Sequence, residues 1–339
     1  MKILVTGGTG YIGSHTVVEL QNNGFEVVIM DNLSNSYIEV VDNIAKITGI
    51  RPGFEKIDLT EKEKLDHFFN HHTDIVGVIH FAALKAVGES VDKPLDYYYN
   101  NILSLINILS CMKKYRISNI VFSSSCTVYG QPDELPVNEE SPIKPAWSPY
   151  AHTKQIAEGI IENTTNVEDI QGILLRYFNP IGAHESALIG ELPIGIPNNL
   201  IPFLTQTAIG KRDILKVFGK DYKTPDGTAI RDYIHVVDLA KAHVVAIDRL
   251  LNKTNKKKVE MFNLGTGNGY SVLEVIQSFE KIRGVKLNYK FVNRRAGDIE
   301  QVWADTSYAN EELGWKAEKD LDDMMLSAWN WEKELAQNS

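Results

Sequence analysis

Short apolar runs alternate with amphipathic stretches through the first half of the chain. Residues 2–6 (KILVT) have the aliphatic and β-branched composition of a buried strand, and the amphipathic stretch that ends at Gly24 predicts a helix. A second strand is expected at 25–30 (FEVVIM). Because strands that alternate with helices assemble into parallel sheets with helices on both faces, this half predicts a doubly wound α/β fold.

The alternation continues to about residue 180 and then weakens. We expect further strands at 54–57, at 74–81, from 120, at 171–177 and at 261–264, and further helices at 37–48, at 60–69, at 94–115, from 149 and from 272. Beyond residue 180, short apolar runs are separated by prolines and glycines. We therefore predict a Rossmann-type domain at 1–180 and a smaller mixed α/β substrate-binding part at 181–339, with some crossing of the chain between them.

Three glycines, Gly7, Gly10 and Gly13, stand between the first strand and the first helix. A dinucleotide-binding loop requires this context, because glycines permit a tight turn and let backbone N–H groups approach a pyrophosphate. The spacing is G-x-x-G-x-x-G, whereas the standard fingerprint is G-x-G-x-x-G. Asp31 ends the second strand, where a carboxylate can bind an adenosine ribose. Asp58 ends the third strand, either at the ligand edge of the sheet or as the cap of the next helix.

Tyr150 and Lys154 lie four residues apart on an expected helix, so their side chains face the same way. An ammonium beside a phenol favours the phenolate, and we expect Lys154 to lower the pKa of Tyr150 from about 10 toward the working pH. Such a tyrosine can act as a general acid and base. Three serines at 123–125 end the strand before it and place hydroxyls at the same edge. A Y-x-x-x-K spacing also occurs on ordinary surface helices, and its value here comes from its place after the glycine loop.

Two other polar features have two readings each, and a basic run has one. Lys85 follows a loop of small residues and is either a cofactor contact or a solvated charge. Asn100 and Asn101 interrupt the apolar face of the 94–115 helix, and since buried asparagines need partners, we expect one of them to contact a cofactor or hold a neighbouring loop. The basic run at 253–258 is expected to be a solvated loop.

Composition excludes several classes of protein. The 339 residues are 43% hydrophobic and 23% charged, as in ordinary globular proteins, and the net charge of −9 argues against general nucleic-acid binding. No apolar run approaches the roughly 20 residues of a membrane span, and no leader is expected before the first strand, so we predict a cytoplasmic protein. Cys111 and Cys126 lie in apolar stretches and are expected to be reduced. No metal site is predicted, on the expectation that neither an H-x-x-x-H spacing nor a clustered acid accompanies the adjacent His71 and His72.

Seven spaced motifs agree with one family. They are TGGTGYIGSH, HFAALKAVGES, SSSCTVYG, SPYAHTK, LRYFNPIGAH, RDYIHVVDLA and RRAGD, in this order along the chain. Together they resemble the extended short-chain dehydrogenase/reductase family and, more closely, the UDP-glucose 4-epimerases. The resemblance covers nearly the full chain.

The resemblance implies a site for NAD. The cofactor-binding residues that it implies are Gly7, Gly10, Tyr11, Ile12, Gly13, Asp31, Asn32, Leu33, Ser34, Asn35, Ser36, Asp58, Leu59, Phe81, Ala82, Ala83, Lys85, Asn100, Ser125, Tyr150, Lys154 and Phe178. No arginine lies beside Asp31 to bind a 2′-phosphate, which favours NAD over NADP.

The resemblance also implies the chemistry, which is interconversion of UDP-galactose and UDP-glucose at C4 through a 4-keto intermediate. Tyr150 would be the catalytic base, Lys154 its tuner, and Ser125 a hydrogen-bond partner of the sugar oxygen. The substrate-binding residues that it implies are Lys85, Ser125, Tyr150, Asn179, Asn199, Leu200, Lys216, Val217, Phe218, Arg231, Arg295, Asp298 and Val302.

Other activities share this fold. A sugar-nucleotide 4,6-dehydratase needs an acid pair just after the active-site hydroxyl, and Cys126 and Thr127 at those positions argue against it. An enzyme acting on UDP-glucuronate stays open. An NAD-sensing regulatory protein would typically lack the tyrosine or the lysine, and both are present.

Two finer expectations follow from the resemblance. Val302 matches a position that borders the sugar pocket, and its small volume predicts that N-acetylated UDP-sugars are accepted as well. The family usually forms a four-helix dimer interface, which the 94–115 helix and the helix from Pro149 would provide in a homodimer.

Overall fold

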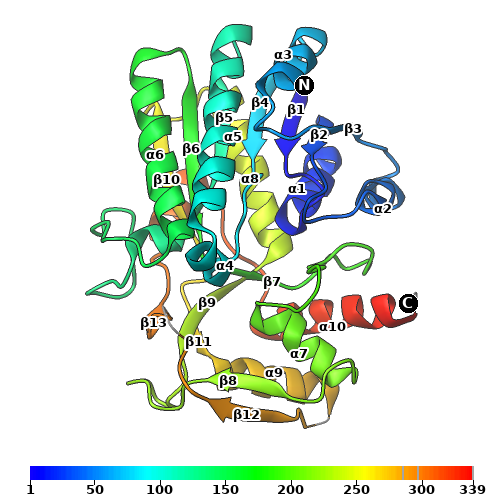
Figure 1. The fold of residues 1–339 in the computed structure, drawn as a ribbon, viewed down its shortest axis with the longest axis vertical. Coiled ribbons are helices and arrows are strands. Elements are labelled where there is room, and N and C mark those ends of the chain that lie inside the picture. The colour runs from blue at the N-terminus through cyan, green and yellow to red at the C-terminus, as the bar shows by residue number, and fades with distance from the viewer. Residues whose placement is uncertain (285, 296–297, 338–339) are drawn as a thin grey trace.

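A seven-stranded parallel sheet forms the larger part of the molecule. The computed structural model describes residues 1–284, 286–295 and 298–337. The strand order is β10-β6-β5-β4-β1-β2-β3, so the chain moves outward from β1 in both directions (Figure 1). The strands are β1 (Lys2–Thr6), β2 (Glu26–Asp31), β3 (Gly53–Lys56), β4 (Ile75–His80), β5 (Asn119–Ser125), β6 (Gln171–Tyr177) and β10 (Val259–Leu264).

Helices cover both faces of this sheet, as the alternating pattern predicts. One face carries α1 (Tyr11–Asn22), α2 (Glu39–Thr48) and α8 (Val236–Leu251), and the other carries α3 (Lys62–His71), α5 (Pro94–Tyr115) and α6 (Pro149–Val167). The central strands are apolar on both faces because both faces are covered: Ile3, Leu4 and Val5 have no exposed surface. The Rossmann-type sheet is therefore confirmed.

The chain returns to this sheet after residue 180. Both α8 and β10 lie beyond that point, and α8 packs along α1 while β10 pairs with β6. This is the expected crossing of the chain. The division into domains at 1–180 and 181–339 stays a prediction.

The remaining elements form a smaller part below the sheet in Figure 1. One small sheet contains β7 (Asn179–Ile181), β9 (Ile230–His235), β11 (Gly269–Ser271) and β13 (Gln301–Val302), and a second pairs β8 (Leu215–Phe218) with β12 (Tyr289–Val292). The helices α7 (Leu200–Ala208), α9 (Val272–Arg283) and α10 (Leu321–Gln337) pack with these sheets around one core. Elsewhere in the chain there are three short helical segments, α4 (Val87–Asp92), η1 (Cys126–Tyr129) and η2 (Ala309–Leu313). The smaller part is therefore mixed α/β, as expected, and has its own core.

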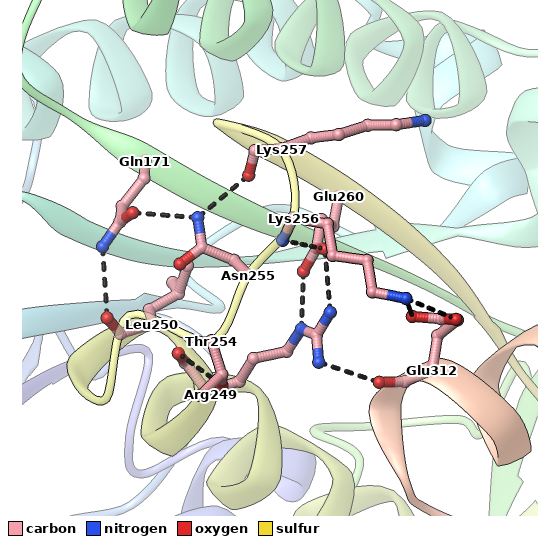
Figure 2. A network of polar contacts seen from close by, with 9 residues as sticks. All are labelled: Gln171, Arg249, Leu250, Thr254, Asn255, Lys256, Lys257, Glu260 and Glu312. Atoms are coloured by element: carbon pink, nitrogen blue, oxygen red, sulfur yellow. Dashed lines mark hydrogen bonds and ion pairs between the residues drawn. The ribbon is translucent and has the colours of Figure 1, made fainter.

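The basic run at 253–258 is an exposed loop that is hydrogen-bonded to its neighbours (Figure 2). Asn255 Nδ2 donates to Gln171 Oε1 (2.9 Å), and the Lys256 backbone N–H donates to Glu260 Oε1 (2.8 Å). Glu260 is buried and receives a two-pronged bond from Arg249, with Nε at 2.7 Å from Oε2. Five of the six residues are exposed and none is in a helix or strand, so the expectation of a solvated loop is confirmed. Its backbone is anchored as well, because a buried carboxylate needs donors and the loop supplies one.

None of the helices in these described ranges is both long and apolar enough to cross a bilayer. Cys111 and Cys126 are both unpaired thiols.

Candidate active site

The loops that follow β1, β2 and β4 meet at the carboxyl edge of the sheet. The Gly7 backbone N–H donates to the Met30 carbonyl (2.8 Å), and the Phe81 N–H donates to the Thr6 carbonyl (3.0 Å). Strand order reverses between β1 and β4, and ligands of open α/β sheets bind at such a point.

The glycine loop leaves no room for side chains. Gly7 has a left-handed backbone (φ +70°), and a Cβ there would lie 2.8 Å from the Ala82 nitrogen. A Cβ on Gly13 would lie 2.2 Å from the Gly7 carbonyl oxygen. Within α1, all of which the structure describes, Gly10 is the N-cap, no side chain caps the N-terminus and no acid stands in the first turn. The first N–H groups of α1 are therefore available to an anion, and these residues fit the pyrophosphate of a dinucleotide.

The residues expected at the adenosine end are joined by hydrogen bonds. Asp31 Oδ2 accepts from the Thr9 N–H (3.2 Å), and its Oδ1 accepts from the Leu33 N–H (2.9 Å) and Ser36 Oγ (3.2 Å). Asp31 thus holds the 32–36 turn against the glycine loop.

The N-cap of α3 is Glu61, so the expected capping role of Asp58 is wrong, and Asp58 lies at the ligand edge of the sheet. Its Oδ1 accepts from the Thr60 N–H (2.9 Å) before α3, while its Oδ2 accepts from Asn32 Nδ2 (2.9 Å) at the ligand edge. Asn107 on α5 supports this corner by donating to the Leu59 carbonyl (2.9 Å), a contact that sequence reasoning missed. Its only signal in the sequence is a polar residue on the apolar face of a helix.

The loop after β4 is held by Asn101 rather than by Asn100. Asn101 Oδ1 accepts from the Leu84 N–H (2.8 Å), and its Nδ2 donates to the Leu84 carbonyl (3.0 Å) and to Thr153 Oγ1 (3.1 Å). Asn100 donates to Asn101 Oδ1 (3.0 Å). The expectation that one of the two asparagines holds a neighbouring loop is confirmed, and Asn101 links that loop to α6.

Tyr150, Lys154 and Ser125 come together where β5 ends against α6. Ser148 caps α6 by accepting from the Ala151 N–H (3.2 Å), which places Tyr150 in the first turn. The Tyr150 side chain hydrogen-bonds to Ser125. Lys154 Nζ donates to the Ser123 carbonyl (2.6 Å) and lies 5.8 Å from the centroid of the Tyr150 ring.

Of the three serines at 123–125, only Ser125 directs its hydroxyl to Tyr150. The hydroxyl of Ser123 pairs with Tyr177, and that of Ser124 donates to Glu158. Ser125 Oγ accepts from the Thr127 N–H (3.2 Å), so its own proton is free to point to Tyr150.

Burial dominates the electrostatics of this group. It lowers the pKa of Lys154 to about 8, against the opposing effect of Glu158. It raises the pKa of Tyr150 to about 12, against the opposing effect of the hydrogen bond from Ser125. The expected lowering of the Tyr150 pKa is therefore wrong for the ligand-free chain, because desolvation disfavours a phenolate and the Lys154 ammonium points to a carbonyl instead of the phenol oxygen.

His80 ends β4 beside this group and is buried. A hydrogen bond of 2.8 Å joins its Nδ1 to Thr6 Oγ1, and burial, with a smaller effect of the nearby Lys154 charge, lowers its pKa to about 3. A neutral imidazole follows at any physiological pH.

The expected substrate residues of the second part lie on α7 or at its N-cap, on β7, β8, β9 and β13, and in the segment between β12 and β13. Val302 pairs with Arg231 between β13 and β9, and the Arg231 guanidinium also donates to the Ile299 carbonyl (2.6 Å). The Arg295 guanidinium lies 4.5 Å from the centroid of the Phe218 ring. The Val217 side chain is buried in the core of the second part, so only its backbone can face a ligand. The remaining members of the set are Asn179, Asn199, Leu200, Lys216 and Asp298, and two residues of the RRAGD motif, Ala296 and Gly297, lie outside the described residues.

The prediction of no metal site assumed that no H-x-x-x-H spacing is present, and this assumption is wrong. His67 and His71 are four residues apart on α3, and their ring centroids lie 4.4 Å from each other. Within the described parts of the chain, no group of three or more His, Cys, Asp or Glu side chains is arranged to hold a metal ion.

The close contact at Gly13 gives a first test. Gly13→Ala would force a Cβ against the Gly7 carbonyl, so the turn must open and the cradle for the pyrophosphate is lost. We expect the purified variant to carry at least tenfold less dinucleotide than the wild type, measured by absorbance after acid release. Gly159→Ala on α6 meets no atom within 4 Å and should keep the wild-type content. Equal content in the Gly13 variant would contradict the cradle.

Comparison with known proteins places the chain in a family. The family model for GDP-mannose 4,6-dehydratase matches residues 4–327. A UDP-glucose 4-epimerase of Bacillus subtilis is 50% identical over 333 residues, with 98% of this chain and 97% of the relative covered. A crystal structure of the enzyme from Bifidobacterium longum with NAD+ and UDP is 46% identical over the full length of both chains (TM-score 0.95), and one from Stenotrophomonas maltophila with NAD and formylated UDP-arabinopyranose is 46% identical over the same span (TM-score 0.96). The cradle, the Tyr150–Lys154 pair and these likenesses agree, and the chain belongs to the UDP-glucose 4-epimerases.

Proposed function

We propose that this chain interconverts UDP-galactose and UDP-glucose at C4, with NAD as its resident cofactor. The observation that carries the proposal is the group of Ser125, Tyr150 and Lys154 beside a cradle that fits a dinucleotide. An acid–base tyrosine next to such a cradle suits oxidation of an alcohol and reduction of the resulting ketone. Membership of the epimerases supports C4 of a UDP-hexose as the position of that alcohol.

The residues that would hold NAD divide along the edge of the sheet. The glycine loop and the N-terminus of α1 suit the pyrophosphate, and Asp31 with the 32–36 turn suits the adenosine ribose. Lys154 and Phe178 lie at the other end, where the nicotinamide would sit. When bound, NAD supplies the acceptor and then the donor of a hydride at C4.

The side chains of this site manage the proton. Tyr150 takes the proton of the C4 hydroxyl as the hydride leaves, and Ser125 hydrogen-bonds to the same sugar oxygen. Lys154 stabilises the charge on the phenol oxygen. The product of this half is a flat 4-keto sugar, and Tyr150 returns the proton when the hydride returns to the other face. The residues that bind UDP must hold the substrate while the sugar turns.

The site differs in its fit to the three competing functions. A dehydratase would need an acid pair where η1 carries Cys126 and Thr127, and burial raises the pKa of the Cys126 thiol to about 12, so it is a poor acid. UDP-glucuronate remains a candidate substrate, and its inclusion in a substrate panel separates the two epimerase activities. A purely NAD-sensing role does not require Tyr150.

We also propose a homodimer and a cytoplasmic enzyme of galactose metabolism and sugar-nucleotide supply. Leu95, Tyr99 and Ile106 leave an apolar strip exposed on α5, with 79% of Leu95 accessible. α5 and α6 adjoin, with a 2.8 Å hydrogen bond between Tyr98 and His152. Such a strip suits a helix-paired interface between two copies. Sedimentation at micromolar concentration would show a monomer if this is wrong.

Tyr150→Phe tests the reaction. Removal of the hydroxyl leaves no group to exchange the C4 proton, so kcat for UDP-galactose should fall by about 10²–10⁴-fold. Turnover is measured by coupling UDP-glucose formation to its dehydrogenase. Tyr308→Phe, on a partly exposed ring that stacks on Phe262, is the matched control and should retain activity. Unchanged kcat in the Tyr150 variant would refute the mechanism.

Lys154→Met tests the tuning of Tyr150 by charge. Lys154 Nζ lies 5.8 Å from the centroid of the Tyr150 ring. Loss of a cation at about that distance should raise the Tyr150 pKa by about 2 units at an effective dielectric constant of about 20. The rising limb of the kcat–pH profile should therefore move to higher pH by that amount. A limb that stays in place would show that Lys154 does not act through Tyr150.

The stability of the Lys154→Met variant serves as its control. The pKa of Lys154 is about 8 when folded and near 10.5 when unfolded, so the unfolded chain binds more protons between these values. The buried cation therefore costs stability below pH 8, and this cost fades as the pH rises toward 10.5. The variant should be at least as stable as the wild type at pH 7, so lost activity cannot be assigned to unfolding.

Val302 tests the width of the sugar pocket. We propose that the enzyme also takes UDP-N-acetylglucosamine, since Val302 is small and packs with Phe178 in one apolar cluster. Val302→Tyr should lower the ratio of UDP-N-acetylglucosamine to UDP-galactose turnover at least tenfold, whereas Val302→Ala should preserve it. Absence of wild-type turnover of the N-acetylated sugar would contradict the proposal.

A further inference from the structure

Glu191 is a carboxylate that contacts two residues expected to bind NAD and the UDP-sugar, both of which are anionic. It lies in the segment between β7 and α7, and it belongs to none of the expected site residues. Its Oε1 accepts from Asn199 Nδ2 (2.6 Å) and forms an ion pair with Lys85 Nζ (3.4 Å). Lys85 comes from the loop after β4 and Asn199 from the start of α7. One carboxylate oxygen therefore joins the cofactor side of the site to the substrate side.

The protein holds this carboxylate in place. The Glu191 side chain is only 12% exposed, although the Lys85 side chain is 50% exposed. The Glu191 carbonyl accepts from Trp331 Nε1 on α10 (3.0 Å), and Gly190 lies so close to the Trp331 ring that a Cβ would be 2.5 Å from it. At the other end of the segment, Tyr11 Oη donates to the Gly182 carbonyl (2.7 Å). Glu191 is therefore a fixed acceptor rather than a mobile surface acid.

Asn199 shows the effect of this acceptor. It occupies the N-cap of α7, a position where asparagine usually bonds to the first N–H groups of the helix. Its side chain makes no such bond, while its amide donates to Glu191. The first N–H groups of α7 thus stay available to an anion, and no acid stands in the first turn of this fully described helix.

The two partners of Glu191 contribute unequally. A hydrogen bond of 2.6 Å to a carboxylate is charge-assisted and strong, whereas a half-exposed ion pair at 3.4 Å contributes little to binding. Lys85 instead offsets the negative charge that Glu191 would present to an approaching diphosphate. The orientation of Asn199 is therefore the larger effect.

We propose that Glu191 is a positioning residue for the substrate: it turns the Asn199 amide away from the α7 cap and holds it for the UDP moiety, without touching the ligand itself. The identity of the ligand rests on the proposed function. The positioning rests on the contacts above.

Binding of UDP to the NAD-loaded enzyme, measured by titration calorimetry, tests this role. Glu191→Ala should weaken the Kd for UDP about tenfold, as expected for loss of one charge-assisted hydrogen bond, and should raise KM for UDP-galactose with kcat near the wild-type value. Glu191→Gln keeps an oxygen that accepts from Asn199 and should recover most of the affinity. Glu185→Ala, an exposed acid in the same segment, should bind UDP as the wild type does.

A double-mutant cycle shows whether Glu191 acts through Asn199. In an Asn199→Ala background, Glu191→Ala should cause no further loss of UDP affinity. Additive losses, or a fall in kcat at unchanged affinity, would overturn the inference. If Glu191→Ala is unstable by thermal melting, Glu191→Gln decides: the inference predicts near-wild-type affinity, and a tenfold loss overturns it.

The two proposals fail in different ways. A wild type that binds UDP but does not epimerise UDP-galactose refutes the proposed function, while the UDP titrations still decide the role of Glu191. A wild type that turns over substrate, with variants that bind UDP normally, refutes the role of Glu191 alone.

Discussion

The ammonium of Lys154 is the constraint around which the rest of the site is built. It is buried where α6 crosses the end of β5 and donates a hydrogen bond to the Ser123 carbonyl. Burial lowers its pKa to about 8. A charge in such a place needs a rigid surrounding, and α6 is fixed one turn further on. There Glu158 forms a buried two-pronged pair with Arg176 of β6, at 2.9 and 2.7 Å. A buried ion pair is costly to break, so this pair fixes α6 against β6. Tyr150, in the first turn of α6, is thereby held at the carboxyl edge of the sheet.

The glycine loop also positions groups at the carboxyl edge of the sheet, through its backbone geometry. Gly13 lets α1 approach the turn so closely that its first N–H groups point over the carboxyl edge, where the Tyr150 and Lys154 side chains also arrive. Burial raises the pKa of that phenol to about 12. The positive nicotinamide of a bound NAD would oppose this rise, so a raised pKa is compatible with a role as a base.

Elements that bury both faces of a sheet could be predicted from the sequence, because such strands are continuous apolar runs. β6 at 171–177 and α5 at 94–115 have the predicted bounds. The return of α8 and β10 to the sheet, and the anchoring of 253–258 by Gln171, depend on contacts between segments far apart in the sequence and leave no local pattern. The site shows the same division. Tyr150, Lys154 and Ser125 follow from spacing and resemblance, whereas the direction of the Tyr150 pKa and the clamp by Asn101 depend on burial, which exists only in three dimensions.

The two ends of the substrate site differ in character, and the difference suits the proposed reaction. Asn199, Arg231 and Arg295 carry directional donors in the part proposed to hold UDP, while Phe178 and Val302 belong to one apolar cluster in the part proposed to hold the sugar. Directional bonds fix a ligand group in one orientation, whereas an apolar wall restrains its position with little angular preference. A 4-keto sugar must present both of its faces to one hydride site. Strong directional contacts to the hexose would oppose that turn, so the binding energy has to lie on the nucleotide, and the positioning of Asn199 by Glu191 lies at that end.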